Sequence, residues 1–208
     1  MKIQTIFLTL VALFVTTQTL TAQSMSKPYK TIKVERHIDA PAERVWNALV
    51  LDYGKISDFS PFIYASNYEN GSLKGKEGAE RKCLFNEKGT QWSHERIAEI
   101  DSDAMTMKNI IVDAQKFPID PDNSYAVYSV RDNGDGSSTA GYTFHFRATP
   151  AFLGGLMKGA FTKSLNETLI GLEHHLTTGE RVTGGSENAK AVVKAYKKSG
   201  DYGDYETR

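Results

Sequence analysis

The stretch "IDAPAERVWNALVLDYGKISDFSPFI", residues 38–63, decides the fold class. Pro41 fits the first position of a helix, where its missing N–H leaves no hydrogen bond unmade, and Glu43 complements the positive end of the helix dipole. An apolar stripe at helical spacing follows, made of Val45, Trp46, Leu49 and Val50. Gly54 interrupts it, and "KISDFSPF" predicts a second short helix that ends at Pro61. Two short helices are therefore expected in succession.

The segments around these helices have the period of β-strands. Before them, "YKTIKVERHID" alternates apolar and polar residues, which indicates a half-buried strand. After them, further strands are expected at about 62–69, 78–86, 90–100, 104–113, 124–132 and 138–148. The connections are short and consist mainly of Asn, Asp, Gly and Pro, as turns require. Short connections between successive strands predict an antiparallel meander.

One long helix is expected after Pro150, over residues 152–177. Its inward side carries bulky apolar residues and also a small, partly polar row at four-residue spacing, Ala160, Ser164 and Thr168. Bulky residues fill a core, whereas a small row either accommodates close packing or leaves space for a ligand. The whole pattern predicts an α+β fold of about seven antiparallel strands curved around this helix. The two short helices would close one end, with Trp46 as a buried plug.

The chain is expected to have three parts. Residues 1–24 have the pattern of a secretory signal peptide, with Lys2 before the apolar run Ile6–Val15 and small, polar residues after it; a short N-terminal helix is the alternative. The run is too short to remain as a membrane span, and no cysteine follows it for a lipid anchor. We therefore expect an exported protein, periplasmic or secreted, with a domain at 25–179. Residues 180–208 are polar and broken by glycines, which predicts a flexible tail with at most a short helix near 188–198.

Composition limits the partners. The 25 basic and 25 acidic residues cancel, so no net field favours nucleic acid, and a neutral or apolar small molecule is the expected partner. The lone Cys83 cannot form an intramolecular disulfide, and its alternating strand predicts a half-buried thiol rather than a nucleophile. No HExxH or CxxC pattern is present, and Glu173, His174 and His175 point to different helix faces, so neither a metal nor a cofactor is expected.

Taken with the element order, the segments "ERIAEID", "FPIDPDNSYAVYSV" and "TFHFRATPAFLGGLMKGAF" resemble the START-like (SRPBCC) superfamily. This superfamily includes the bacterial polyketide cyclase/dehydrase and lipid-transport proteins, the birch-pollen allergen and plant hormone receptors. The resemblance covers residues 29–179. It implies a helix-grip fold with a cavity between sheet and helix for a hydrophobic or amphipathic molecule. The widely spaced glycines of "NGSLKGKEG" and the signal peptide depart from the pattern of many relatives.

The strand at 90–100 carries the candidate polar groups, and its residues alone do not decide which face points inward. Trp92, His94 and Arg96 share one face; Ser93, Glu95 and Ile97 share the other. The resemblance favours Ser93 and Glu95 as cavity residues, with Tyr64 nearby. A buried Glu95 would need a partner or would keep its proton. The complete predicted ligand-binding set is Tyr64, Ser93, Glu95, Met157, Ala160, Phe161, Ser164 and Thr168.

Three functions are consistent with the sequence. The first is a non-enzymatic carrier or sensor for a lipid, an isoprenoid or a polyketide-like or aromatic compound. The second is a cyclase or dehydratase in which Glu95, with Tyr64 or a histidine, transfers protons. The third is a structural or protein-interaction module with a filled core. An internal cavity of roughly 300 Å³ or more would argue against the third.

Overall fold

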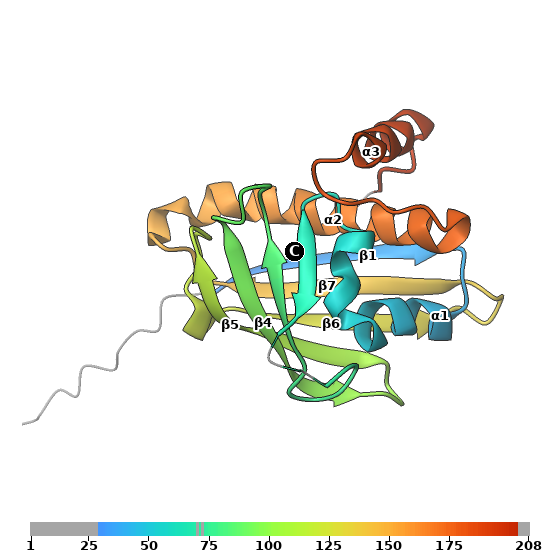
Figure 1. Ribbon diagram of the computed structural model, residues 1–208. Helices are drawn as coiled ribbons and strands as arrows, with labels where there is room; N and C mark the ends of the chain where they lie inside the picture. The colour runs from blue at the N-terminus through green and yellow to red at the C-terminus, as the bar shows by residue number, and fades with distance from the viewer. Residues whose placement is uncertain (1–28, 70, 72, 204–208) are drawn as a thin grey trace, which may run out of the picture.

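A curved antiparallel sheet grips one long helix (Figure 1). The computed structural model describes residues 29–69, 71 and 73–203; the expected signal peptide lies outside the described residues. The strands are β1 (Lys30–Ile38), β2 (Ala65–Tyr68), β3 (Glu80–Leu84), β4 (Trp92–Asp101), β5 (Thr106–Gln115), β6 (Tyr125–Asp132) and β7 (Ser138–Phe146). The helices are α1 (Ala42–Trp46), α2 (Gly154–Thr178) and α3 (Glu187–Ser199).

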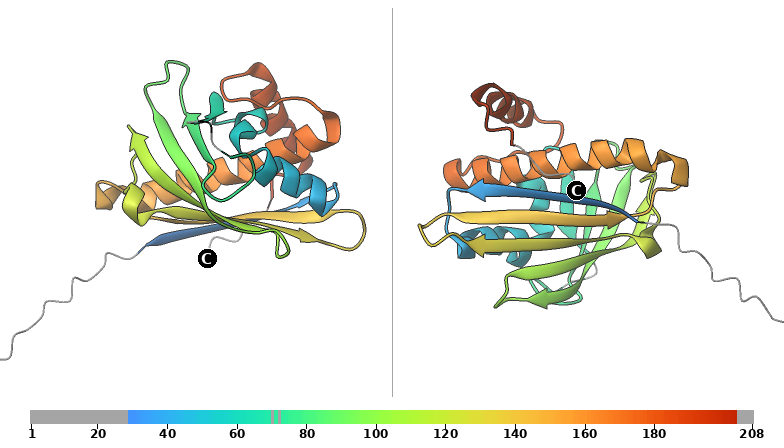
Figure 2. Two further views of the ribbon diagram at one scale, coloured as in Figure 1. Left: turned by 60° about the horizontal axis from the view of Figure 1, so that its bottom comes forward. Right: turned by 180° about the vertical axis from the view of Figure 1, so that it is seen from behind.

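The sheet order is β1-β7-β6-β5-β4-β3-β2, with antiparallel pairing between all neighbours. Strands β2 to β7 follow one another as a meander, and β1 closes the sheet by pairing with β7. Figure 2 shows how the sheet curls, so that its concave face is turned toward α2. The predicted α+β helix-grip fold is confirmed.

The segment that follows β1 forms the closed end. Helix α1 continues into a π-helical turn (Asn47–Leu51) and then a short 3-10 helix (Tyr53–Asp58). Pro41 is extended, with ψ 143°, and precedes the first helical turn instead of lying within it. Trp46 is buried, as expected for a plug. Gly54, in the first turn of the 3-10 helix, allows the ring of Tyr68 to approach closely, because a Cβ there would lie 2.4 Å from that ring.

The short helix expected near 188–198 is present as α3, and together with the segment before it this helix packs on the outer side of α2. A second apolar cluster holds them in place, formed by Ile170, Val182, Ala189 and Val192. The amide of Val182 donates to the carbonyl of Asp58 at 2.8 Å, and the amide of Gly184 donates to that of Ile63 at 3.0 Å. The sequence underestimated this packing because only a few apolar residues in a polar segment carry it.

The same tail buries two polar residues of α2, Asn166 and Glu167. Asn166 donates to the carbonyl of Tyr202 at 2.7 Å, and the Tyr202 hydroxyl donates to Glu167 at 2.6 Å. Lys197 also pairs with Glu167, at 3.1 Å. None of the helices in the described ranges is both long and apolar enough to cross a membrane.

Candidate functional site

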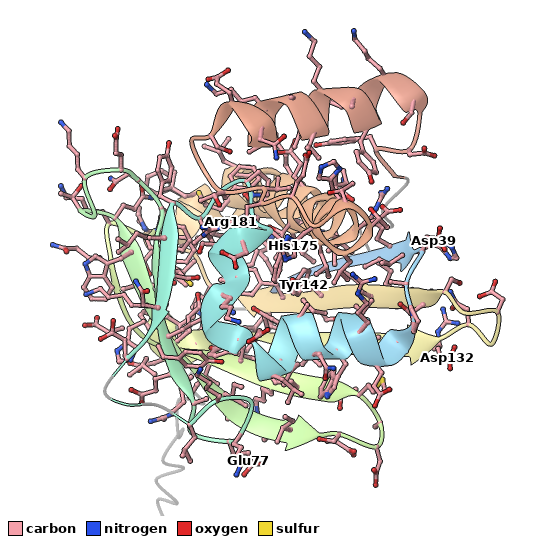
Figure 3. The ribbon with its side chains drawn as sticks, turned by 45° about the vertical axis from the view of Figure 1, so that its right-hand side comes forward. Asp39, Glu77, Asp132, Tyr142, His175 and Arg181 are labelled. Carbon is pink, nitrogen blue, oxygen red and sulfur yellow. The ribbon has the colours of Figure 1, made fainter. Side chains whose placement is uncertain are left out.

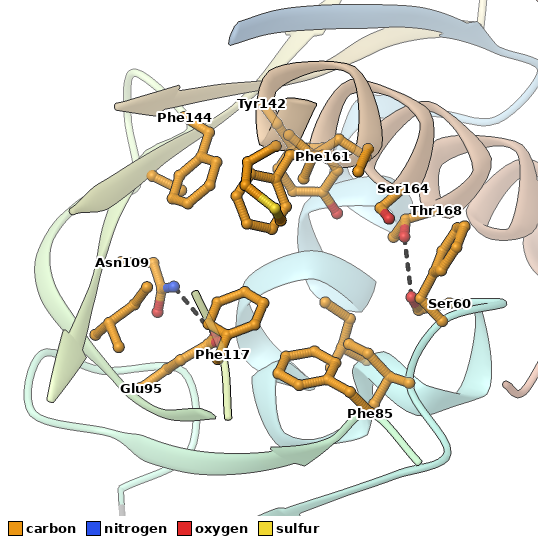
Figure 4. A pocket seen from close by; sticks show the side chains of 18 of the residues that line it. Ser60, Phe85, Glu95, Asn109, Phe117, Tyr142, Phe144, Phe161, Ser164 and Thr168 are labelled. Carbon is orange, nitrogen blue, oxygen red and sulfur yellow. Dashed lines mark hydrogen bonds between the residues drawn. The ribbon is translucent and has the colours of Figure 1, made fainter. Parts of the chain in front are cut away.

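A cavity of about 390 Å³ lies between the concave face of the sheet and the N-terminal half of α2 (Figure 4). The sheet contributes side chains from β3 to β7, and the 3-10 helix and the residues after it contribute Ile56, Ser60, Phe62 and Ile63. The volume falls in the range of ligand pockets, roughly 300–1,000 Å³. The interior is therefore not a filled core, which removes the main support for the structural-module hypothesis.

Aromatic side chains from four separate segments of the chain meet on one side of the cavity. Phe85 and Phe117 are stacked with ring centroids 4.8 Å apart, and Phe117 contacts Phe161 of α2 edge-on at 5.5 Å. Phe144 of β7 also packs edge-on against Phe161, at 5.3 Å. These rings provide a large apolar contact area with little conformational freedom, which suits the hydrophobic body of a ligand.

A buried ion pair lies in the cavity wall opposite the helix. The β3–β4 register sets Arg81 directly across from Glu95, and Arg81 is only 2% exposed. Its Nε and Nη2 donate to Oε2 of Glu95 at 3.0 and 2.7 Å, and its Nη1 donates to the carbonyl of Tyr53 at 2.9 Å. Asn109 donates to the same carboxylate oxygen at 3.1 Å, and Ser93 donates to Oε1 at 2.6 Å. The carboxylate is thus fully compensated in charge, as a buried carboxylate must be.

Three buried tyrosines complete this polar end. Tyr128 accepts a hydrogen bond from Nη2 of Arg81 at 2.8 Å, and Tyr53 donates to the amide oxygen of Asn109. The hydroxyl of Tyr142 is buried and has no hydrogen-bond partner among the described residues. Burial raises the pKa of Tyr128 to about 12 and also raises the pKa of Tyr142. Both phenols therefore keep their protons at neutral pH.

Figure 3 shows Tyr142 inside the fold, whereas the labelled acids Asp39, Glu77 and Asp132 lie at its edges. Arg81 and Glu95 are the only charged side chains among the described residues that line the cavity. The interior therefore combines an apolar wall with a polar end whose formal charges cancel.

The structure brings most of the predicted site residues together. Glu95 and the five predicted residues of α2 line the cavity, namely Met157, Ala160, Phe161, Ser164 and Thr168. Thr168 is also hydrogen-bonded to Ser60, with 2.9 Å between the hydroxyl oxygens. Further along α2, the bulkier residues Leu169, Leu172 and Leu176 belong to the main apolar core.

Two predicted residues lie elsewhere. Ser93 is buried on the inward face of β4 but contacts the carboxylate of Glu95 instead of lining the cavity. Tyr64 is 38% exposed and lies against Gly185 of the tail. The reason is that β2 begins only at Ala65, so Tyr64 precedes the strand and is not part of its inward face.

Arg81, Asn109 and the three tyrosines were missed by sequence reasoning. One signal was available, since Arg81 alternates in step with Cys83 in "ERKCL" and a cysteine is a strong indicator of a buried strand face. Cys83 is fully buried, beyond the half-burial expected, and burial raises the pKa of its thiol well above the usual range. A protonated, inaccessible thiol is a poor nucleophile.

No group of three metal-ligating side chains occurs in residues 29–69, 71 and 73–203. The search of curated proteins finds no match. Among solved structures, a solution NMR structure from Thermobifida fusca is 24% identical with a TM-score of 0.57, covering 70% of this chain and 92% of that one. The protein XoxI from Bacillus cereus is 19% identical with a TM-score of 0.53, covering 72% and 96%.

The crystal structure of Ara h 8.0201 is 18% identical with a TM-score of 0.58, covering 72% of this chain and 99% of that one. At these identities the structures share the helix-grip fold, and no function is carried over from them. The model of the family described as polyketide cyclase/dehydrase and lipid transport matches residues 30–177, nearly the whole of the sheet and α2. The chain therefore belongs to this START-like family of helix-grip proteins.

Proposed function

We propose that this protein is an exported carrier that holds one small hydrophobic molecule, or an amphipathic one with a small polar end, between the sheet and α2. The observation that carries the proposal is the cavity of about 390 Å³, which has aromatic side chains on one side and a polar end around Arg81 and Glu95. Family and fold support hydrophobic-ligand binding in general. Carrier action requires only this shape and these surfaces.

The state of Glu95 favours a carrier over a cyclase or dehydratase. Its carboxylate accepts four hydrogen bonds, two from Arg81 and one each from Asn109 and Ser93. A general base must present a free lone pair to the substrate proton within hydrogen-bond reach. Here Oε2 is already bound by three donors and Oε1 accepts from Ser93, so neither oxygen is free of protein donors.

The export part of the proposal comes from the sequence, since residues 1–24 have the n, h and c regions of a signal peptide. The test is to express the full chain in a bacterial host and to measure the mass of the protein in the cytoplasmic, periplasmic and culture fractions. A product cleaved near Ala22 to Ser24 and found outside the cytoplasm is expected. An uncleaved chain retained in the cytoplasm would contradict export.

Binding is tested with the neutral apolar dye N-phenyl-1-naphthylamine, whose fluorescence rises in apolar surroundings. Saturable binding of one dye per chain is expected for the mature protein. The variant Ala126→Phe fills the cavity from β6, because Ala126 is buried and lines it. The matched control, Ala191→Phe, places the same ring on the exposed surface of α3.

The dye should be lost from the Ala126→Phe variant and retained by the Ala191→Phe variant, with both variants folded by circular dichroism. Equal dye binding by both would place the dye outside the cavity and contradict the proposed site. An absence of dye binding by the unsubstituted protein would contradict the carrier function.

A further inference from the structure

The hydrogen-bonding groups at the polar end are unevenly used. Oε2 of Glu95 accepts from three donors, and Arg81 is bound to the carboxylate, to the carbonyl of Tyr53 and to Tyr128. Within the described part of the chain, the Tyr128 hydroxyl accepts from Arg81 and donates to no other group, and the Tyr142 hydroxyl has no partner at all. The donors left for a ligand at this end are therefore phenolic O–H groups, whereas Oε1 of Glu95 accepts only one hydrogen bond, from Ser93.

Tyr142 is 1% exposed and lines the cavity, so water outside the fold does not satisfy its hydroxyl. Its ring is packed edge-on against that of Tyr128, with centroids 4.6 Å apart, which fixes its position. A buried hydroxyl without a partner costs free energy, about 1–3 kcal/mol, which a ligand oxygen would recover. The hydroxyl oxygen has almost no accessible surface in the empty protein, so a ligand oxygen reaches it only after a small shift of neighbouring side chains.

The charges at this end select the kind of polar group. Arg81 and Glu95 neutralise each other, and no other charged side chain of the described residues lines the cavity. An ionised carboxylate or phosphate would enter without a free cation to pair with and would approach the carboxylate of Glu95. An uncompensated charge in such an interior is strongly unfavourable.

We infer that the ligand is a neutral, largely apolar molecule carrying a carbonyl-type oxygen, such as a ketone, an aldehyde, a quinone or an ester, which accepts a hydrogen bond from Tyr142. This inference rests on the proposed carrier function and narrows its ligand class. Fatty acids and other ionised amphiphiles are excluded from this cavity. The aromatic side of the cavity holds the apolar body of the same molecule.

The test uses three probes that share one ring system: 2-acetylnaphthalene, 2-ethylnaphthalene and 2-naphthoate. Each is titrated at pH 7 against the mature protein loaded with N-phenyl-1-naphthylamine, and displacement gives its dissociation constant. The ketone should bind at least about tenfold more tightly than the ionised 2-naphthoate, because the carboxylate must lose its hydration in a site with no free cation. The hydrocarbon measures the contribution of the ring system alone.

The variant Tyr142→Phe separates the hydrogen bond from the apolar contacts. It should raise the dissociation constant of 2-acetylnaphthalene about fivefold, the change expected for the loss of one hydrogen bond. The dissociation constant of 2-ethylnaphthalene should stay unchanged. The control Tyr125→Phe removes a hydroxyl from β6 outside the cavity, where the ring of Tyr125 stacks on that of His145. It should leave the dissociation constants of all three probes unchanged.

Two results would overturn the inference while leaving the carrier function intact. One is tight binding of 2-naphthoate, equal to that of the ketone. The other is an equal effect of Tyr142→Phe on ketone and hydrocarbon, or no effect on either. If neither the dye nor any of the three probes binds, the carrier function fails and this inference fails with it.

Discussion

Replacing Arg81 by Met should destabilise the protein strongly, because it leaves the carboxylate of Glu95 buried without its counter-charge. Arg81 is 2% exposed and Glu95 9% exposed, so solvent compensates little of the loss. Breaking a buried ion pair by removing one partner costs about 3–5 kcal/mol. This is a large part of the roughly 5–15 kcal/mol by which domains are stable.

The assay is urea unfolding at pH 7, followed by the fluorescence of the two tryptophans and by circular dichroism. With a urea slope near 2 kcal/mol per M, a loss of about 4 kcal/mol lowers the unfolding midpoint by about 2 M. The double variant Arg81→Met/Glu95→Gln removes the orphaned charge. It should be more stable than the Arg81→Met variant by at least about 1 kcal/mol, which shows the coupling between the two sites.

A change of the midpoint by less than about 0.5 M in the Arg81→Met variant, or about 1 kcal/mol at that slope, would contradict a strongly coupled buried ion pair. Additive losses would contradict it as well. If the double variant lost the sum of what Arg81→Met and Glu95→Gln lose singly, the two side chains would not interact.

Three further predictions concern the interior. Tyr142→Phe should raise the free energy of unfolding of the empty protein by about 1 kcal/mol, measured by urea unfolding, because it removes a hydroxyl without a hydrogen-bond partner. A loss of stability would show that this hydroxyl is hydrogen-bonded. The pKa of Tyr128 is near 10 in the unfolded chain and about 12 in the folded protein. Between these pH values the folded state binds more protons, so the free energy of unfolding should fall by up to about 1.4 kcal/mol per pH unit. Urea midpoints that stay constant from pH 9 to 11 would contradict this. Gly171→Ala should lower the free energy of unfolding by at least about 2 kcal/mol in the same assay, because its Cβ would lie 2.1 Å from the carbonyl oxygen of Phe59. The control Gly155→Ala, at an exposed position of the same helix, should be neutral or stabilising.

The order of elements could be predicted from the sequence because its signals are local. Alternation in "YKTIKVERHID" and the turn residues between strands depend only on neighbouring positions. The packing of the tail depends instead on contacts between distant segments. Val182 and Ala189 are isolated apolar residues in a polar stretch, and Glu167 resembles a solvated helix residue until Tyr202 covers it.

The candidate site also has one part that local sequence patterns predict and one part that depends on pairing between distant segments. The small row on α2 could be predicted because helical periodicity places Ala160, Ser164 and Thr168 on one side. The partner of Glu95 could not, because alternation with Cys83 indicates only that Arg81 lies on a buried face and not which residue it meets. Only the register between β3 and β4 sets Arg81 opposite Glu95, and a pairing register is not visible in either strand alone.

Native mass spectrometry of the mature protein, purified from an exporting bacterial host, tests the carrier function most directly. We expect one neutral small molecule per chain, identified after solvent extraction and absent from the cavity-filled Ala126→Phe variant. A folded protein that carries no molecule, and takes up none when incubated with a lipid extract of the host, would contradict it.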